Sequence, residues 1–127
     1  MFFTSDNGAA KRFDGIHNSC GVMQGKKRSL NEGGIRVPMV ARWPGKIKPG
    51  TLSNHPWYFP DIMPTLAEIA GVSKQVPKDI DGISVLPTLL GKGKQKQHEY
   101  MYWQYGVRAA RAGKWKGIGE GRTHAPL

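Results

Sequence analysis

Asp6 and Asn7 stand side by side directly after the short apolar run Phe2-Phe3. A carboxylate and an amide carbonyl are hard oxygen ligands of the kind that Ca²⁺ and Mg²⁺ take. Gly8 allows the chain to turn sharply beside an ion. Asp-Asn-Gly is also an ordinary turn sequence, so this motif alone is consistent with either a metal site or a plain turn.

A second group of chemically capable residues is the cationic triplet Lys26-Lys27-Arg28, which follows Gly25 and precedes the pair Gly33-Gly34. Three adjacent cations could bind an oxyanion, and the glycines permit close approach of the backbone. A solvated basic loop is the alternative. The phosphate-binding P-loop is excluded, because the Gly-Lys pair has neither a glycine five residues earlier nor a strand directly before it.

The elements around these motifs are expected to hold them at a strand end. Phe2 to Ser5 is typical of the end of a buried strand, and ligands gather at the carboxyl ends of strands in open α/β sheets. Residues 9–34 are polar, contain several glycines and show no clear period, which predicts a long loop. Arg36 to Trp43 predicts a short strand that Pro44-Gly45 ends.

The helix with the clearest signals spans 61–70, with Asp61 as the N-cap, Pro64 in the first turn and Gly71 as the stop. Its apolar side chains recur at helical spacing, and we expect this face in the core: Ile62, Leu66, Ile69 and Ala70.

The C-terminal third is predicted to end in a small antiparallel sheet. Residues 87–90 could form a single helical turn. Strands are expected over 100–105 and 107–118, with turns at Gly106 and Gly113.

Composition narrows the classes of protein. With 127 residues, the chain is long enough for one small domain, and its net charge of +10 favours an anionic partner such as nucleic acid, an acidic membrane surface or a sulfated or phosphorylated substrate. Loss of the acidic part of a longer parent would also explain the charge. No run of about 18 apolar residues occurs, which excludes a membrane span.

Cysteine and histidine offer little chemistry by their spacing. The single Cys20 excludes an intrachain disulfide and is expected to be a structural thiol. None of the four histidines has ligand spacing to another, so all are expected in loops or at the surface, with His98 a candidate for the substrate mouth: His17, His55, His98 and His124.

Sequence blocks in a fixed order resemble the type I sulfatases. They begin with TSDNG and GKKRSLNEGGIRVPMVARWPGKIKPG, and continue with PDIMPTLAEIAG and DIDGISVLPTLLG. HEYMYWQY and ARAGKWKG then resemble the C-terminal subdomain of that family. The resemblance covers nearly the whole chain, and its specificity lies in the order of the blocks.

The resemblance implies an α/β fold, with a partial alkaline-phosphatase-like sheet followed by a small C-terminal antiparallel sheet subdomain. It assigns residues 1–91 to the C-terminal part of the catalytic domain and 92–127 to the antiparallel subdomain. The implied activity is hydrolysis of aryl or carbohydrate sulfate monoesters with Ca²⁺.

The resemblance also assigns roles to single residues. Asp6 and Asn7 would be metal ligands, and Lys27, five residues before Glu32, would contact the substrate sulfate. Glu32 and Arg36 would have structural roles, as a charge pair or as an anchor of the loop.

The chain departs from the family in one respect that bears on catalysis. The family's nucleophile is a formylglycine made in a C/S-x-P-x-R motif, whereas Cys20 is followed by Gly-Val-Met-Gln. We therefore expect no catalytic residue here, a formylglycine in an upstream segment, and negligible activity of residues 1–127 alone. The other metal ligands and the catalytic histidines are expected upstream as well.

The remaining expectations concern partners and location. The partner is expected to be a sulfated small molecule or carbohydrate, without nucleic acid, and the family suggests a periplasmic, secreted or lysosome-like compartment. Three alternatives stay open: a basic module that binds nucleic acid or sulfated glycan through the cations in 26–28 and 92–96, a non-catalytic truncated homologue, and a related phosphate-ester hydrolase.

Overall fold

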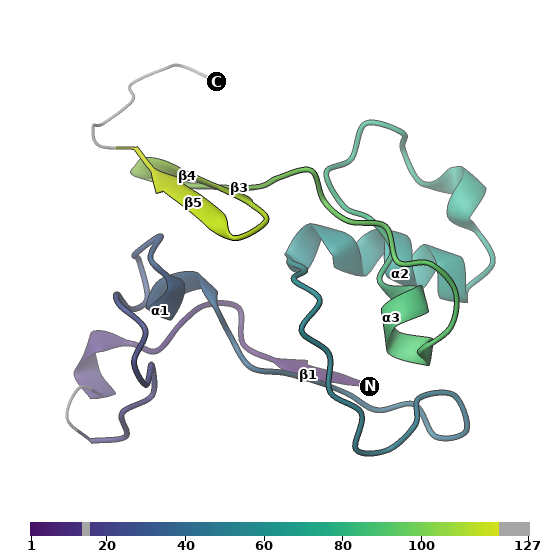
Figure 1. Ribbon diagram of the computed structural model, residues 1–127, viewed down its shortest axis with the longest axis horizontal. Coiled ribbons are helices and arrows are strands. Elements are labelled where there is room, and N and C mark those ends of the chain that lie inside the picture. Colours follow the sequence, from purple (N-terminus) through teal and green to yellow (C-terminus); the bar gives the residue numbers. More distant parts are fainter. Residues whose placement is uncertain (14–15, 120–127) are drawn as a thin grey trace. The chain divides into compact units, whose positions relative to one another are not determined.

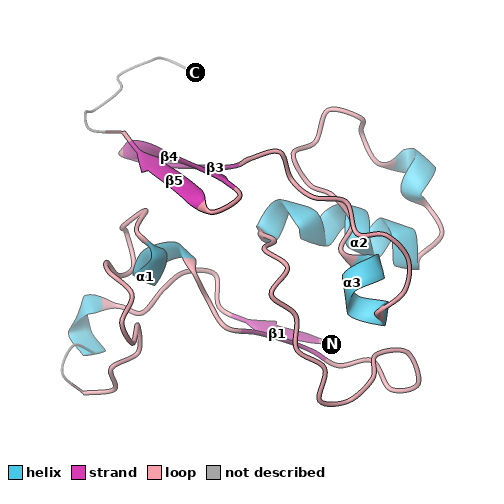
Figure 2. Cartoon of the chain, viewed as in Figure 1, coloured by secondary structure: helices cyan, strands magenta, loops and turns pink. Residues whose placement is uncertain are grey.

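The computed structural model describes residues 1–13 and 16–119, so His124 lies outside the described part (Figure 1). Its strands and α-helices are short and are joined by long loops (Figure 2): β1 (Phe2–Thr4), α1 (Glu32–Ile35), β2 (Met39–Ala41), α2 (Ile62–Ile69), α3 (Leu86–Leu90), β3 (Met101–Tyr105), β4 (Val107–Ala112) and β5 (Trp115–Ile118). Single 3-10 turns cover Lys11–Phe13, Phe59–Asp61 and Ser73–Gln75. No helix in the described ranges is long and apolar enough to cross a membrane.

The chain forms two compact units. The helical unit contains Met1 and Ala41–His98, and the sheet unit contains Phe2–Val40 and Glu99–Leu127. The two units are defined by the contacts that residues of this chain make with one another. The division at residue 91 concerns the domains of a longer protein and stays a prediction.

β1 and β2 form a two-stranded sheet. The two strands run antiparallel. Met1 and Arg42 exchange backbone hydrogen bonds of 2.8 Å, and the Thr4 hydroxyl donates to the Pro38 carbonyl at 2.8 Å. The expectation that Phe2 to Ser5 is buried is wrong for Phe3, whose side chain is 67% exposed, because this small sheet does not cover that face.

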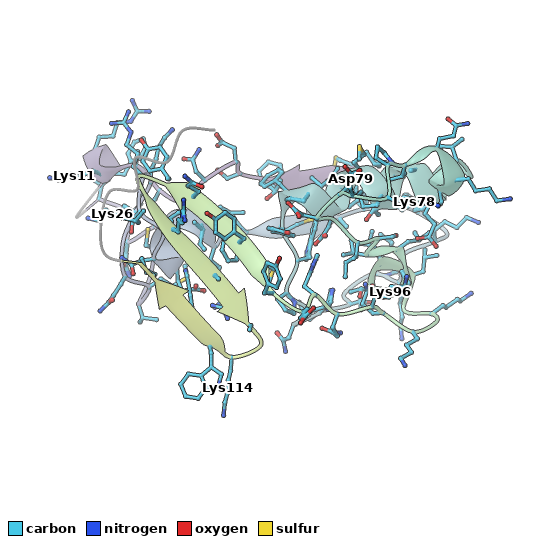
Figure 3. All side chains as sticks on the ribbon, turned by 90° about the horizontal axis from the view of Figure 1, so that it is seen from above. Lys11, Lys26, Lys78, Asp79, Lys96 and Lys114 are labelled. Carbon is cyan, nitrogen blue, oxygen red and sulfur yellow. The ribbon has the colours of Figure 1, made fainter. Side chains whose placement is uncertain are left out.

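β3, β4 and β5 form a second sheet in sequence order, and both strand pairs are antiparallel. Gly106 and Gly113 have φ angles of 70° and 55°, which suit glycine at the two tight turns. Lys114 lies at the second turn (Figure 3), with its ammonium 5.4 Å from the Trp115 ring centre. The predicted antiparallel sheet is confirmed, but it has three strands instead of two, because the turn at Gly113 divides residues 107–118 into β4 and β5.

α2 begins and ends close to the predicted positions. At its end, Gly71 has a φ of 73°, and the amides of Gly71 and Val72 donate to Glu68 and Ala67. This pattern satisfies the last carbonyls of a helix and is the reason for a glycine there. The predicted single turn before Gly91 is also present, as α3.

The predicted buried face of α2 is wrong. Leu66 and Ile69 are 47% and 36% exposed, whereas Asp61 and Thr65 are almost completely buried. The Thr65 hydroxyl donates to the Asp61 carbonyl at 2.6 Å and accepts the Val85 amide at 2.9 Å. Polar side chains can be buried on this face because backbone amides of the 82–85 segment donate hydrogen bonds to them.

Candidate functional site

The predicted site lies in the sheet unit, where three stretches of backbone are joined by hydrogen bonds. The Gly8 amide donates to the Gly34 carbonyl at 2.9 Å, which ties the Asp-Asn-Gly turn to α1. The Lys27 amide donates to Ala9 at 2.9 Å, and the Gly33 amide donates to Gln24 at 2.7 Å. The two motifs found in the sequence are therefore neighbours in space.

This approach of backbone to backbone excludes side chains at the glycines. A Cβ on Gly8 would lie 1.8 Å from the Gly33 carbonyl oxygen, and one on Gly34 would lie 2.0 Å from that of Ser29. Both distances are far below van der Waals contact. The glycines thus allow the turn and the cationic loop to pack directly on α1.

The cationic loop is shaped by its own local contacts. Gly25 and Arg28 have φ angles of 79° and 76°, and the Ser29 amide donates to the Lys26 carbonyl at 2.8 Å. The Ser29 hydroxyl accepts bonds from the backbone and side-chain amides of Asn31, at 3.1 and 3.0 Å. Asn31 therefore supports the loop through hydrogen bonds.

A cavity of about 410 Å³ opens between these segments. Its lining includes the cationic residues Lys27 and Arg36, the polar residues Ser5, Asn7 and Ser19, and the apolar residues Phe13, Met23, Val37 and Pro38. The structure thus brings two of the predicted site residues, Asn7 and Lys27, to one cavity. The third, Asp6, is exposed and does not line the cavity.

Among the described residues, the cations of this cavity have no acidic partner. In the ranges 1–13 and 16–119, no ion pair or side-chain hydrogen bond engages Lys27 or Arg36. The cavity therefore carries positive charge, which attracts an anion.

Glu32 and Arg36 were expected to have structural roles, as a charge pair or as an anchor of the loop, and Glu32 forms its ion pairs with two other residues. Its Oε1 atom lies 2.8 Å from both the Arg111 guanidinium and the Lys116 ammonium, which belong to β4 and β5. Burial raises the pKa of Glu32, but hydrogen bonds and positive charge from Lys116 and Arg111 outweigh it, so this pKa lies below its ordinary value. The carboxylate ties the sheet to the first residue of α1.

Asp6 and Asn7 fit a metal site only in part. Their oxygens are suitable donors, and Ca²⁺ requires about six to eight oxygen ligands. Among the described residues, no three acidic, imidazole or thiol side chains come together as a metal site. Most ligands would have to come from other segments.

Cys20 lines the cavity and donates a weak hydrogen bond from its Sγ atom to the Gly33 carbonyl at 3.5 Å. No base is hydrogen-bonded to this thiol in the described part of the chain. Its geometry is that of a structural thiol.

The helical unit contains a polar cluster that the sequence reading missed. Asp61 is completely buried, and its carboxylate accepts the Tyr58 amide at 3.0 Å and the Ile83 amide at 2.8 Å. His98 Nε2 lies 2.8 and 3.0 Å from the two carboxylate oxygens. Asp61 was predicted to cap α2, but its side chain makes no cap bond to that helix.

His98 lies in a loop, as expected, but not at the surface: its side chain is 7% exposed and packs edge-on against Tyr58 with ring centres 5.0 Å apart. Its partners include no predicted site residue. His17 is exposed, as expected. Asp61 and His98 are 37 residues apart, so no local sequence pattern connects them.

His55 lies in the electrostatic range of this pair. Burial lowers its pKa, the Asp61 carboxylate raises it, and His98 lowers it, with a net decrease. Asp61 and His98 thus satisfy each other, whereas the buried His55 Nε2 atom has no hydrogen-bond partner in the described part of the chain.

Comparison with known proteins supports the resemblance. Residues 24–119 match the family described as N-sulphoglucosamine sulphohydrolase, C-terminal. The chain is 36% identical to mouse steryl-sulfatase over 107 residues, covering 80% of the chain and 17% of that protein. It is 40% identical to bovine arylsulfatase A over 124 residues, covering 91% of the chain and 24% of that protein.

A solved structure from work on the metabolism of multiple glycosaminoglycans by Bacteroides thetaiotaomicron has the same fold. The match has a TM-score of 0.70 and 34% identity, and it covers 94% of this chain and 27% of the other. The chain thus spans about a quarter or less of the length of these relatives. Together, the family match and these similarities show that the chain belongs to the sulfatases and corresponds to the C-terminal portion of that family.

Proposed function

We propose that this chain forms one side of the active site of a calcium-dependent sulfate-ester hydrolase. The observation that carries the proposal is the cavity where the unneutralised Lys27 and the amide of Asn7 meet, in a chain of the sulfatase family. The nucleophile, a formylglycine, would come from an upstream segment.

In this proposal, Lys27 binds the sulfuryl oxygens of the substrate. Negative charge stays spread over these oxygens while the ester bond breaks, so a fixed ammonium stabilises the transition state. The backbone contacts of Gly8 with α1 and of Lys27 with Ala9 fix the backbone of Lys27 before the substrate arrives. This preorganisation lowers the cost of ordering it during the reaction.

Asp6 and Asn7 would supply two of the oxygen ligands of Ca²⁺. When bound, this ion adds positive charge beside the same sulfuryl oxygens. The carboxylate of Asp6 is exposed and has no ion pair among the described residues, so further ligands from other segments can reach it.

A sulfated small molecule or carbohydrate is the proposed substrate class, in a periplasmic, secreted or lysosome-like compartment. A nucleic-acid-binding module is not favoured, because the family match spans the cationic triplet and most of the loop and sheet regions after it.

The test is hydrolysis of 4-nitrophenyl sulfate by the protein that carries residues 1–127 together with the expected upstream segment. Lys27→Ala should lower kcat/KM by about 10²–10³, the typical effect of removing one transition-state donor. The matched control is Lys46→Ala, which removes an exposed lysine in a turn of the helical unit. Residues 1–127 alone should show negligible turnover.

Two outcomes would contradict the proposal. One is an unchanged kcat/KM in Lys27→Ala, and the other is absence of turnover by the unmodified longer protein. Chelation by EDTA should also abolish activity, and added Ca²⁺ should restore it. Asp6→Asn should raise the Ca²⁺ concentration needed for half-maximal activity.

A further inference from the structure

Arg36 shares the cavity with Lys27, although no catalytic role was expected for it. Its backbone amide donates to the Glu32 carbonyl at 2.7 Å, which fixes the residue at the end of α1. Its backbone therefore continues directly from α1, on which the Gly8 turn packs through the bond from the Gly8 amide to the Gly34 carbonyl.

Arginine often serves the fold by pairing with an acid, and the described residues show no such pair for Arg36. The nearest acid in the sequence, Glu32, is already paired with Arg111 and Lys116. Within residues 1–13 and 16–119, no carboxylate pairs with Arg36. Arg111 is a structural arginine, because it pairs with Glu32. Arg36 makes no such pair in the described residues and is therefore available to a ligand.

Arginine and lysine recognise anions differently. The planar guanidinium donates two parallel hydrogen bonds to a carboxylate or sulfate, whereas the lysine ammonium acts as a point charge. A cavity of about 410 Å³ is in the size range of small-molecule sites and exceeds what one sulfate group would fill.

We propose that Arg36 binds a second anionic group of the substrate, a carboxylate or another sulfate, while Lys27 binds the sulfate that is hydrolysed. This inference rests on the proposed function. Arg36 is thus a specificity residue that selects substrates with two anionic groups. The apolar lining from Phe13, Met23 and Val37 would contact the part of the substrate between them.

The test measures binding of stable sulfonates by calorimetry, with the same longer protein. Benzenesulfonate carries one anionic group, benzene-1,3-disulfonate carries two sulfonates, and 3-sulfobenzoate carries a sulfonate and a carboxylate. We expect the unmodified protein to bind at least one of the two dianions about tenfold more tightly than benzenesulfonate, as one charged hydrogen-bonded pair would provide. The tighter dianion identifies the second group.

Arg36→Gln should remove this preference, and Arg36→Lys, which keeps the charge but loses the paired donors, should retain about threefold. The control Arg28→Gln removes a neighbouring exposed cation that does not line the cavity, and it should keep the full preference. Thermal unfolding of each variant checks its fold. If Arg36→Gln does not fold, the comparison of Arg36→Lys with Arg28→Gln decides.

An unmodified protein without preference for either dianion would overturn the inference. Equal weakening of all three ligands by Arg36→Gln would also overturn it, since Arg36 would then act on the single sulfonate or on the fold. Because these ligands are not hydrolysed, the result does not depend on turnover. A protein that prefers dianions through Arg36 but does not hydrolyse 4-nitrophenyl sulfate would refute the proposed activity and leave the second anion site intact.

Discussion

The two units of this chain differ in whether their functional-looking charged side chains have partners. In the helical unit, Asp61 is completely buried and its carboxylate is satisfied by two backbone amides and His98. In the sheet unit, Lys27 and Arg36 line a cavity, and no acidic side chain in the described residues neutralises them. A satisfied buried charge stabilises one arrangement of the fold, whereas unneutralised charge in a cavity is available to a ligand.

Glu32 connects these two behaviours within the sheet unit. Its side chain is 31% exposed and binds two cations. It is therefore less buried than Asp61, but unlike Lys27 and Arg36 it has charged partners among the described residues. Because Glu32 pairs with Arg111 and Lys116, it does not pair with Arg36, which has no ion pair in the described part of the chain. The chain has 19 Lys and Arg residues but only nine Asp and Glu residues. The positions of these few acids therefore determine which basic side chains are left without an ion pair.

The largest effect is expected from Asp61→Ala. Loss of the carboxylate leaves the Tyr58 and Ile83 amides and His98 without their acceptor, and breaking a buried pair typically costs about 3–5 kcal/mol. Urea denaturation measures the change in the free energy of unfolding. The exposed Asp79 provides the control, and Asp79→Ala should change it by less than about 0.5 kcal/mol. Similar small losses in both variants would show that the buried cluster is not structural.

A somewhat smaller effect is expected from Gly8→Ala. The added Cβ would meet the Gly33 carbonyl oxygen, so the backbone must move, at a cost of about 1–3 kcal/mol in the free energy of unfolding. Lys27 would be displaced with it, and 4-nitrophenyl sulfate turnover should fall. Gly117→Ala is the matched control, because a Cβ there meets no atom within 4 Å. If Gly8→Ala is as stable and active as Gly117→Ala, the backbone contacts do not position the site.

The smallest effect is expected from Glu32→Gln, at about 1 kcal/mol, because the ion pairs are partly exposed. The pKa of Glu32 is lowered in the folded protein, so its stabilisation is present above the ordinary pKa and is lost as the pH falls through the lowered value. Denaturation at neutral pH and at about pH 3 should therefore show that the difference in free energy of unfolding between the unmodified protein and Glu32→Gln becomes smaller in acid.

Glu68→Gln, on the exposed face of α2, is the control for this prediction. It should leave the free energy of unfolding and its pH dependence nearly unchanged. A difference between the unmodified protein and Glu32→Gln that stays constant with pH would contradict the assigned ion pairs.

Much of the local structure could be predicted from the sequence. Gly71, Gly106 and Gly113 were expected to end a helix or turn a strand, and each has the positive φ that only glycine adopts easily. The neighbours of a residue largely determine such features. The resemblance of ordered blocks to the sulfatases added the family, which local patterns alone would not show.

The candidate site could be predicted only in part. Asn7 and Lys27 share a cavity as the family assignment suggested, but Arg36 was expected to have a structural role and lines the same cavity. The sequence shows Arg36 four residues after Glu32, a spacing that favours pairing. Only the folded chain shows that Glu32 binds Lys116, 84 residues away.

The sequence by itself determined where this chain turns, which segments extend or coil, and which protein family it belongs to. The tertiary structure decided which charges are neutralised. Asp61 resembles a helix cap in the sequence and becomes the centre of a buried cluster, because His98 and the Ile83 amide reach it from distant segments. Backbone conformation depends mainly on adjacent residues, whereas burial and charge pairing depend on segments that only the folded chain brings together.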